Sequence, residues 1–183
     1  PEIVNGYEDE FVGYHFADEP NTSRYAALAE GAKAFEAMYP GKVSYINLFP
    51  SYARIGDQLY ADSYEAYVDE YLRLFTPNSI SFDAYPINSD KTMRADYYYN
   101  LDLIRYKALE RKIPFWYIGH GGGINVSAQE LNEQEFRWNA WSSFAYGSKG
   151  YRYYPAVKAG RDPRAAGRKR CGQVDADECA VWP

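Results

Sequence analysis

The stretch Phe11-Val-Gly-Tyr-His-Phe-Ala-Asp-Glu-Pro20 decides the fold, because it reads as a β-strand that stops at two acids and a proline. Its first six residues are rich in aromatic and β-branched side chains, which favour strands. Residues 42–48, 79–83 and 114–118 have the same character, and each is bounded by Gly, Pro, Asn or Asp. These four predicted strands recur at intervals of roughly 30 to 36 residues, which is the length of one strand-plus-helix unit.

Helical patterns fill the intervals between these strands. Apolar residues repeat at helical spacing over residues 25–38, 64–75 and 97–108. A fourth helix, which carries Trp138 and Trp141, is predicted to open at the capping box Ser127-Ala-Gln-Glu130.

Residues 150–154 then read as a fifth strand. Regular alternation predicts an α/β fold with a parallel sheet, either open and doubly wound or closed as a barrel. With 183 residues, the chain is too short for a complete (β/α)8 TIM barrel, which takes about 250 residues. We therefore expect a partial barrel.

The composition restricts the classes of partner. Aromatic residues make up 18% of the chain and 20 of them are Tyr, which suits either core packing or the binding of polar, ring-shaped ligands. A net charge of −5 does not favour a nucleic-acid partner. No apolar run approaches the roughly 20 residues of a membrane span.

The predicted barrel domain covers residues 1–154, and residues 155–183 differ from it in composition. Arg, Ala and Cys replace Tyr and Phe there, so we expect an irregular C-terminal tail. The basic run from Lys158 to Arg170 is typical of a solvated tail, although such a run can also bind nucleic acid or acidic lipid. A non-native, out-of-frame extension is a third interpretation. Both cysteines, Cys171 and Cys179, lie in this tail, which excludes a disulfide framework for the body.

In parallel βα architectures the active site lies at the carboxyl ends of the strands. The predicted strands end in acids, amides, a histidine and aromatic side chains, which would meet on one rim. These candidate residues are Asp18, Glu19, Asn47, Tyr52, Asp83, Tyr85, Trp116, Tyr117 and His120.

The adjacent acids Asp18 and Glu19 are the first candidates. Alternation along a strand places Glu19 on the face of His15 and Asp18 on the opposite face. One acid then serves the reaction, while the other orients the next helix, whose capping candidates begin near Asn21. The alternative is that both acids cap that helix and interact with its dipole.

Two further strand ends carry candidate residues. Asp83 closes an apolar strand, where it is either a functional acid or a loop cap. His120 is a sugar-hydroxyl ligand, a proton shuttle or an ordinary loop histidine. The glycines at 121–123 lack the spacing and the lysine of a phosphate-binding loop, and no His-Glu-x-x-His motif occurs. We expect neither a metal nor a cofactor.

Five motifs occur together between residues 2 and 150. They are Tyr14-His-Phe-Ala-Asp-Glu-Pro20, Tyr45-Ile-Asn-Leu-Phe-Pro-Ser-Tyr52, Ser81-Phe-Asp-Ala-Tyr-Pro86, Pro114-Phe-Trp-Tyr117 and Phe144-Ala-Tyr-Gly147. Their combination resembles (β/α)8 glycoside hydrolase-like proteins of the clan that includes β-galactosidases and cellulases. In that clan an Asn-Glu-Pro or Asp-Glu-Pro motif closes the fourth strand, and its Glu is the general acid/base.

The resemblance implies that Glu19 is the general acid/base and that the chain supplies strands four to eight of a barrel. It also implies a nucleophilic Glu at the end of the seventh strand, but residues 116–120 contain no acid. A two-carboxylate mechanism needs a second acid within about 5 to 10 Å. Asp83 is the best substitute in this chain.

The leading hypothesis is a glycoside hydrolase that acts on O-glycosidic bonds of an oligo- or polysaccharide. Glu19 would protonate the leaving oxygen, and Asp83 would act as base, nucleophile or charge stabiliser. The other candidates would bind hydroxyls or stack on the sugar: Asp18, Asn47, Tyr52, Tyr85, Trp116, Tyr117 and His120.

A noncatalytic carbohydrate-binding or scaffold protein on the same fold is the alternative. An esterase on an open sheet ranks last, because no Gly-x-Ser-x-Gly motif is present. For the full-length protein a periplasmic or extracellular location is favoured.

Overall fold

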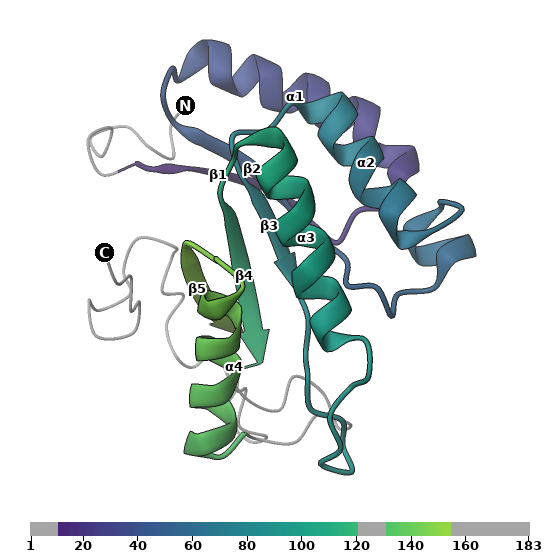
Figure 1. The fold of residues 1–183 in the computed structure, drawn as a ribbon. Helices are drawn as coiled ribbons and strands as arrows, with labels where there is room; N and C mark the ends of the chain where they lie inside the picture. Colours follow the sequence, from purple (N-terminus) through teal and green to yellow (C-terminus); the bar gives the residue numbers. More distant parts are fainter. Residues whose placement is uncertain (1–10, 121–130, 155–183) are drawn as a thin grey trace, which may run out of the picture. The chain divides into compact units, whose positions relative to one another are not determined.

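The structure, a computed structural model, describes residues 11–120 and 131–154, in which strands alternate with helices (Figure 1). In chain order the main elements are β1 (Gly13–Asp18), α1 (Tyr25–Met38), β2 (Val43–Leu48), α2 (Tyr64–Phe75), β3 (Ile80–Asp83), α3 (Tyr97–Arg111), β4 (Phe115–His120), α4 (Glu133–Ala145) and β5 (Gly150–Tyr154). A 3-10 turn, η1 (Thr22–Arg24), precedes α1, and a π-helical turn, η2 (Ile55–Leu59), precedes α2. This is the predicted α/β order, as in part of a (β/α)8 barrel.

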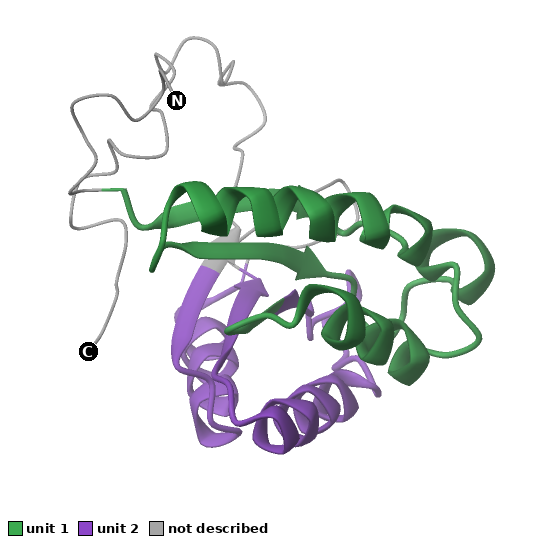
Figure 2. Ribbon diagram, turned by 90° about the horizontal axis from the view of Figure 1, so that it is seen from above, with its two compact units in different colours: residues 1–81 green, residues 82–183 purple. Residues whose placement is uncertain are grey.

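Two compact units, Pro1–Ser81 and Phe82–Pro183, make up the chain, and the boundary falls inside β3 (Figure 2). In the first unit β1 pairs in parallel with β2, and in the second β4 pairs in parallel with β5. Each pair is joined through a helix, as parallel neighbours require. The prediction of parallel strands is therefore confirmed for these two pairs.

Tyrosine packing forms the core of the first unit. Tyr25 of α1 and Tyr67 and Tyr71 of α2 are fully buried, and the ring of Tyr25 lies 5.4 Å from that of Tyr67. Ser63 caps the start of α2, because its side chain accepts a hydrogen bond from the amide of Ala66. Much of the tyrosine content therefore serves packing, which is one of the two roles that the composition suggested.

The second unit is built around β3, α3 and β4. Its fully buried residues include Phe82, Tyr97, Leu101, Ile104 and Tyr117. The rings of Phe82 and Tyr117 lie 5.4 Å apart, so β3 and β4 direct their side chains into the same layer as α3.

The helix that carries Trp138 begins later than the sequence predicted. α4 starts at Glu133, and its capping box is formed by Asn132 and Glu135, with both reciprocal hydrogen bonds at 2.9 Å. The prediction that this helix opens at Ser127 is therefore wrong, because Asn132 supplies an equally good cap one and a half turns further on. Residues 127–130 themselves lie outside the described part of the chain.

Several expectations fall on residues that the structure does not describe. The tail after residue 154 and both cysteines lie outside the described ranges. Within those ranges, no helix is long and apolar enough to cross a membrane.

Candidate functional site at the strand ends

The register between β1 and β2 determines the face of the strand on which Asp18 lies. β1 continues to Asp18, and three steps along it match two along β2: His15 lies opposite Tyr45, and Asp18 lies opposite Asn47. Such a bulge shifts the alternation of side chains by one position. Asp18 therefore shares the face of His15, and the prediction that it points to the opposite face is wrong.

A chain of side-chain hydrogen bonds links residues of three strands, β1, β2 and β3, in the first unit. The Nδ2 of Asn47 donates to the Oδ1 of Asp18 at 3.1 Å, and the Oδ1 of Asn47 accepts from the hydroxyl of Ser81 at 3.1 Å. Asn47 is only 3% exposed, whereas Asp18 is exposed. The buried amide thus orients an accessible carboxylate towards β2 and away from a capping role.

Glu19 has an unusual backbone. Its φ is +46°, in the left-handed region that side chains other than glycine rarely adopt. Its amide donates to the carbonyl of Asn47 at 2.9 Å, and the next residue, Pro20, is buried. A strained residue of this kind persists only when its surroundings hold it, and such residues cluster at functional sites.

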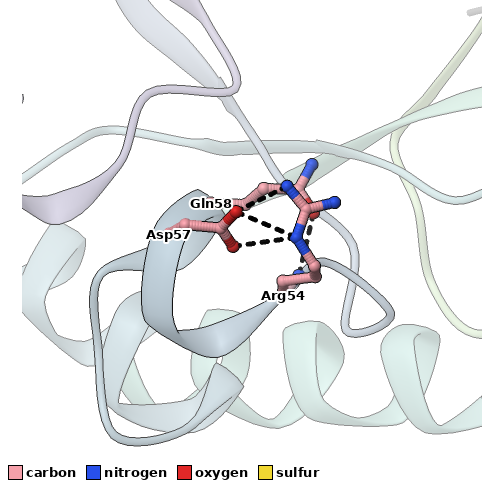
Figure 3. Close-up of polar contacts among 3 residues, drawn as sticks. All are labelled: Arg54, Asp57 and Gln58. Atoms are coloured by element: carbon pink, nitrogen blue, oxygen red, sulfur yellow. Dashed lines mark hydrogen bonds and ion pairs between the residues drawn. The ribbon is translucent and has the colours of Figure 1, made fainter.

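The loop after β2 carries Tyr52, which is half-buried. Two residues later, Arg54 forms a two-pronged ion pair with Asp57, with N–O distances of 2.6 and 2.9 Å, and its amide donates to the side chain of Gln58 (Figure 3). Hydrogen bonds from Arg54 hold the pKa of the Asp57 carboxyl below its usual range. The pair joins the residue before η2 to a residue within that turn.

In the second unit, Tyr85 and His120 lie together. Their ring centroids are 5.5 Å apart; Tyr85 is half-buried and His120 is fully buried. Asp83, two residues before Tyr85 at the end of β3, is 3% exposed. Asp83 and His120 are the last residues of β3 and β4, and Tyr85 lies in the segment that follows β3.

The neighbouring candidates Trp116 and Tyr117 point to opposite faces of β4. Trp116 is half-buried and packs against Gly150 of β5, where an added Cβ would overlap the indole. Tyr117 is fully buried, its hydroxyl donates to the carbonyl of Ala84, and burial raises the pKa of this phenol well above its usual value. Tyr117 therefore supports the core, and we leave it out of the proposed ligand-binding surface.

Asn139 of α4 is a residue that the sequence reasoning missed. It is fully buried, its Nδ2 donates to the hydroxyls of Tyr97 and Tyr117 at 3.0 and 2.8 Å, and its Oδ1 accepts from Tyr151 at 2.8 Å and from the amide of His120 at 3.2 Å. All four hydrogen-bonding positions of the amide are therefore used. The available signal was a polar residue between Trp138 and Trp141 in the helix.

The candidates thus fall into two groups. The first unit holds Asp18, Glu19, Asn47 and Tyr52, and the second holds Asp83, Tyr85, Trp116 and His120. Within the described ranges, no group of three or more His, Cys, Asp or Glu side chains is placed to hold a metal ion.

No protein-family model and no curated protein sequence matches the chain. Solved structures do match it. One is a protein of Bacteroides thetaiotaomicron described as a putative alpha-L-fucosidase, with a TM-score of 0.57 and 10% identity over 84% of this chain and 52% of that one. Another is the beta-galactosidase of the psychrophilic Marinomonas ef1, with a TM-score of 0.53 and 12% identity over 73% of this chain and 21% of that one.

At these identities the likeness shows the fold alone. The chain spans about half the length of the first structure and about a fifth of the second.

Proposed function

We propose that this chain is part of a glycoside hydrolase in which Glu19 is the general acid/base. The observation that carries the proposal is the backbone of Glu19, which is held at φ +46° directly after a parallel strand. Catalytic residues of (β/α) barrels occupy this position, and strained backbones gather at such sites. The two solved structures named above carry glycosidase names, which supports the same class of reaction.

Asp83 is our candidate for the second carboxylate. It ends β3 and is almost completely buried, and a buried acid at a strand end needs a hydrogen-bonding or charged environment to remain there. In this proposal it acts as base, nucleophile or charge stabiliser. Asp18, Asn47, Tyr52, Tyr85, Trp116 and His120 contribute hydroxyl ligands and stacking surfaces for an oligo- or polysaccharide.

The test is Glu19→Gln in the protein that contains this chain. Positioned general-acid catalysis is worth about 10² to 10⁴ in rate, so turnover of a glycoside with a poor leaving group should fall by that factor. A substrate with a good leaving group needs less protonation and should lose less. Asp83→Asn should lower the turnover of both substrates. Full activity of Glu19→Gln on any substrate that the unmodified protein cleaves would rule out the assignment.

A noncatalytic carbohydrate-binding protein is the second candidate. It is favoured by the end of β4, where residues 116–120 include no acid although the related clan places its nucleophile there. A screen of glycosides together with calorimetric titration of oligosaccharides separates the two. Binding without cleavage would select the binding protein, whereas cleavage that depends on Glu19 would select the hydrolase.

A further inference from the structure

One buried hydroxyl connects the two loops that follow β1 and β2. The phenol of Tyr67, on α2, donates to the carbonyl of Pro20 at 2.9 Å and accepts from the amide of Phe49 at 3.2 Å. Pro20 directly follows Glu19, and Phe49 directly follows β2. A single side chain therefore fixes the backbone immediately beyond both strand ends.

The ring of Tyr67 is itself firmly held. It is fully buried, with its centroid 5.4 Å from that of Tyr25, 6.2 Å from the stacked ring of Tyr64 and 6.3 Å from Phe49. Aromatic rings packed from several sides have little rotational freedom. The hydroxyl is thus a fixed point on the helix.

Glu19 needs such a fixed point, because a left-handed backbone costs roughly 1–2 kcal/mol for a residue with a side chain. On its amino side the strain is opposed by the hydrogen bond from the Glu19 amide to Asn47. On its carboxyl side the next residue is a proline with restricted φ, and the carbonyl of that proline is bound by Tyr67. Asn47 of β2 therefore restrains the backbone on the amino side of Glu19, and Tyr67 restrains it on the carboxyl side.

We infer that Tyr67 is a positioning residue: its hydroxyl keeps Glu19 in the strained backbone conformation from which that residue acts. The inference rests on the proposed function for the role of Glu19, but the positioning itself can be measured without any activity. Tyr67 touches no substrate in this scheme and acts only through Pro20 and the loop after β2.

The chain offers a matched control on the same helix. Tyr71, one turn further along α2, is also fully buried, and its hydroxyl donates to a backbone carbonyl, that of Ser79 just before β3, at 3.2 Å. Tyr67→Phe and Tyr71→Phe each remove one oxygen from a buried tyrosine without changing the ring. The Tyr67 hydroxyl makes two hydrogen bonds and that of Tyr71 one, so a general loss of stability is accounted for by the reference amides, and the variants are compared by the local change at Glu19.

The first readout is hydrogen exchange of the Glu19 amide in the full chain, referenced to amides within α2. In Tyr67→Phe its protection should fall by about 10-fold or more, since the loop gains an open state within reach of thermal motion. In Tyr71→Phe it should change no more than the reference amides do. Unchanged protection in Tyr67→Phe, or an equal loss in both variants, would overturn the inference.

A second readout combines Tyr67→Phe with Glu19→Gly. In the unmodified chain, removing the Tyr67 hydroxyl loses its hydrogen bonds, but the Glu19 backbone can then relax, and the relief of strain recovers part of the lost stability. Glycine at position 19 has no such strain, so nothing is recovered. Tyr67→Phe should therefore destabilise the chain more in the Glu19→Gly background than in the unmodified one. Strictly additive effects would contradict the inference.

Kinetics separate this inference from the proposed function. If the intact protein cleaves glycosides, Tyr67→Phe should lower kcat by about 10- to 100-fold with little change in KM, as a displaced catalytic group does. A kcat equal to that of Tyr71→Phe would overturn the inference. If the protein cleaves none while the exchange result appears, Tyr67 still positions Glu19 and only the hydrolase proposal fails.

Discussion

The side chain of Asn47 holds that of Asp18: its Nδ2 lies 3.1 Å from the Oδ1 of Asp18, across the last registered pair of β1 and β2. An amide nitrogen can only donate, so this contact fixes one oxygen of the carboxylate. The other end of the same amide accepts from Ser81. Asn47 is buried and bound on both sides, and it is therefore the residue whose loss should disturb the strand ends of the first unit most.

Replacement of Asn47 by alanine leaves the hydroxyl of Ser81, itself 4% exposed, without this acceptor. A buried polar group that loses its partner costs about 1–3 kcal/mol, so Asn47→Ala should lower the free energy of unfolding by that amount. Urea denaturation measures the change. The exposed Asn78, whose side chain accepts at 3.4 Å from Ser79, is the control. Equal effects of Asn78→Ala and Asn47→Ala would show that the amide network contributes nothing specific.

Glu19→Gly should stabilise the fold while abolishing the proposed activity. Glycine adopts φ +46° without steric strain, so we expect a gain of about 0.5–1 kcal/mol after the entropy of the unfolded chain is taken into account. Thermal unfolding together with glycoside turnover tests the pair of effects.

Thr76→Gly is the matched control, because Thr76 has φ +45° at the end of α2, away from the proposed machinery. It should show the gain in stability without the loss of activity. A loss of stability in Glu19→Gly would mean that side-chain contacts of Glu19 outweigh its backbone strain.

The order of elements could be predicted because it depends on local patterns. Tyr64, Tyr67, Val68, Tyr71, Leu72 and Phe75 repeat at helical spacing, and all are buried on one face of α2 as that spacing requires. The five strands likewise match apolar runs to within a few residues. Local propensity and burial agree in these segments, and so the sequence carries the information.

The details of the site could not be predicted in the same way. The bulge in β1 depends on pairing with β2, which is a non-local contact, and it reversed the expected face of Asp18. Helical spacing assigns Tyr67 to the core, and nothing local reveals that its hydroxyl reaches Pro20, 47 positions away. The start of α4 at Glu133 was missed because the sequence offers two capping boxes, one at Ser127 and one at Asn132.

Stability in acid should report on Glu135. The hydrogen bond from the Asn132 amide lowers the pKa of the Glu135 carboxyl, and the ammonium group of Lys91, 3.0 Å away, lowers it further. A carboxyl with a lowered folded-state pKa contributes stability that is present above its unfolded pKa and is lost as the pH falls through the folded value.

The difference in unfolding free energy between the unmodified chain and Glu135→Gln should therefore be constant from neutral pH to about pH 5 and shrink below about pH 4.3. Denaturant titrations at a series of pH values measure it. Lys91→Met keeps the hydrogen bond from Asn132 and should reduce, without abolishing, the pH-dependent part. If the difference in unfolding free energy between the unmodified chain and Glu135→Gln grows as the pH falls, the Glu135 carboxyl does not have a lowered pKa in the folded state.

Asn139 should control the end of β4. Its Oδ1 binds the amide of His120, and its Nδ2 binds Tyr117, whose hydroxyl in turn binds the carbonyl of Ala84, the residue before Tyr85. The Tyr85–His120 ring pair is therefore held through one buried side chain.

Asn139→Leu keeps the approximate volume but removes all four hydrogen bonds, so several buried groups lose a partner at about 1–3 kcal/mol each before relaxation. We expect a clear loss of unfolding free energy. The hydrogen-exchange rate of the His120 amide should rise by a larger factor than the rates of amides in α3. Nuclear Overhauser effects between the rings of Tyr85 and His120 should become weaker. Asn100→Leu is the matched control, because Asn100 is equally buried in the same unit but its amide donates to the carbonyl of Asp96, the residue before α3, at 2.7 Å. If the two variants change the Tyr85–His120 contact alike, Asn139 has no specific hold on β4, and the position of His120 must come from the strand ladder alone.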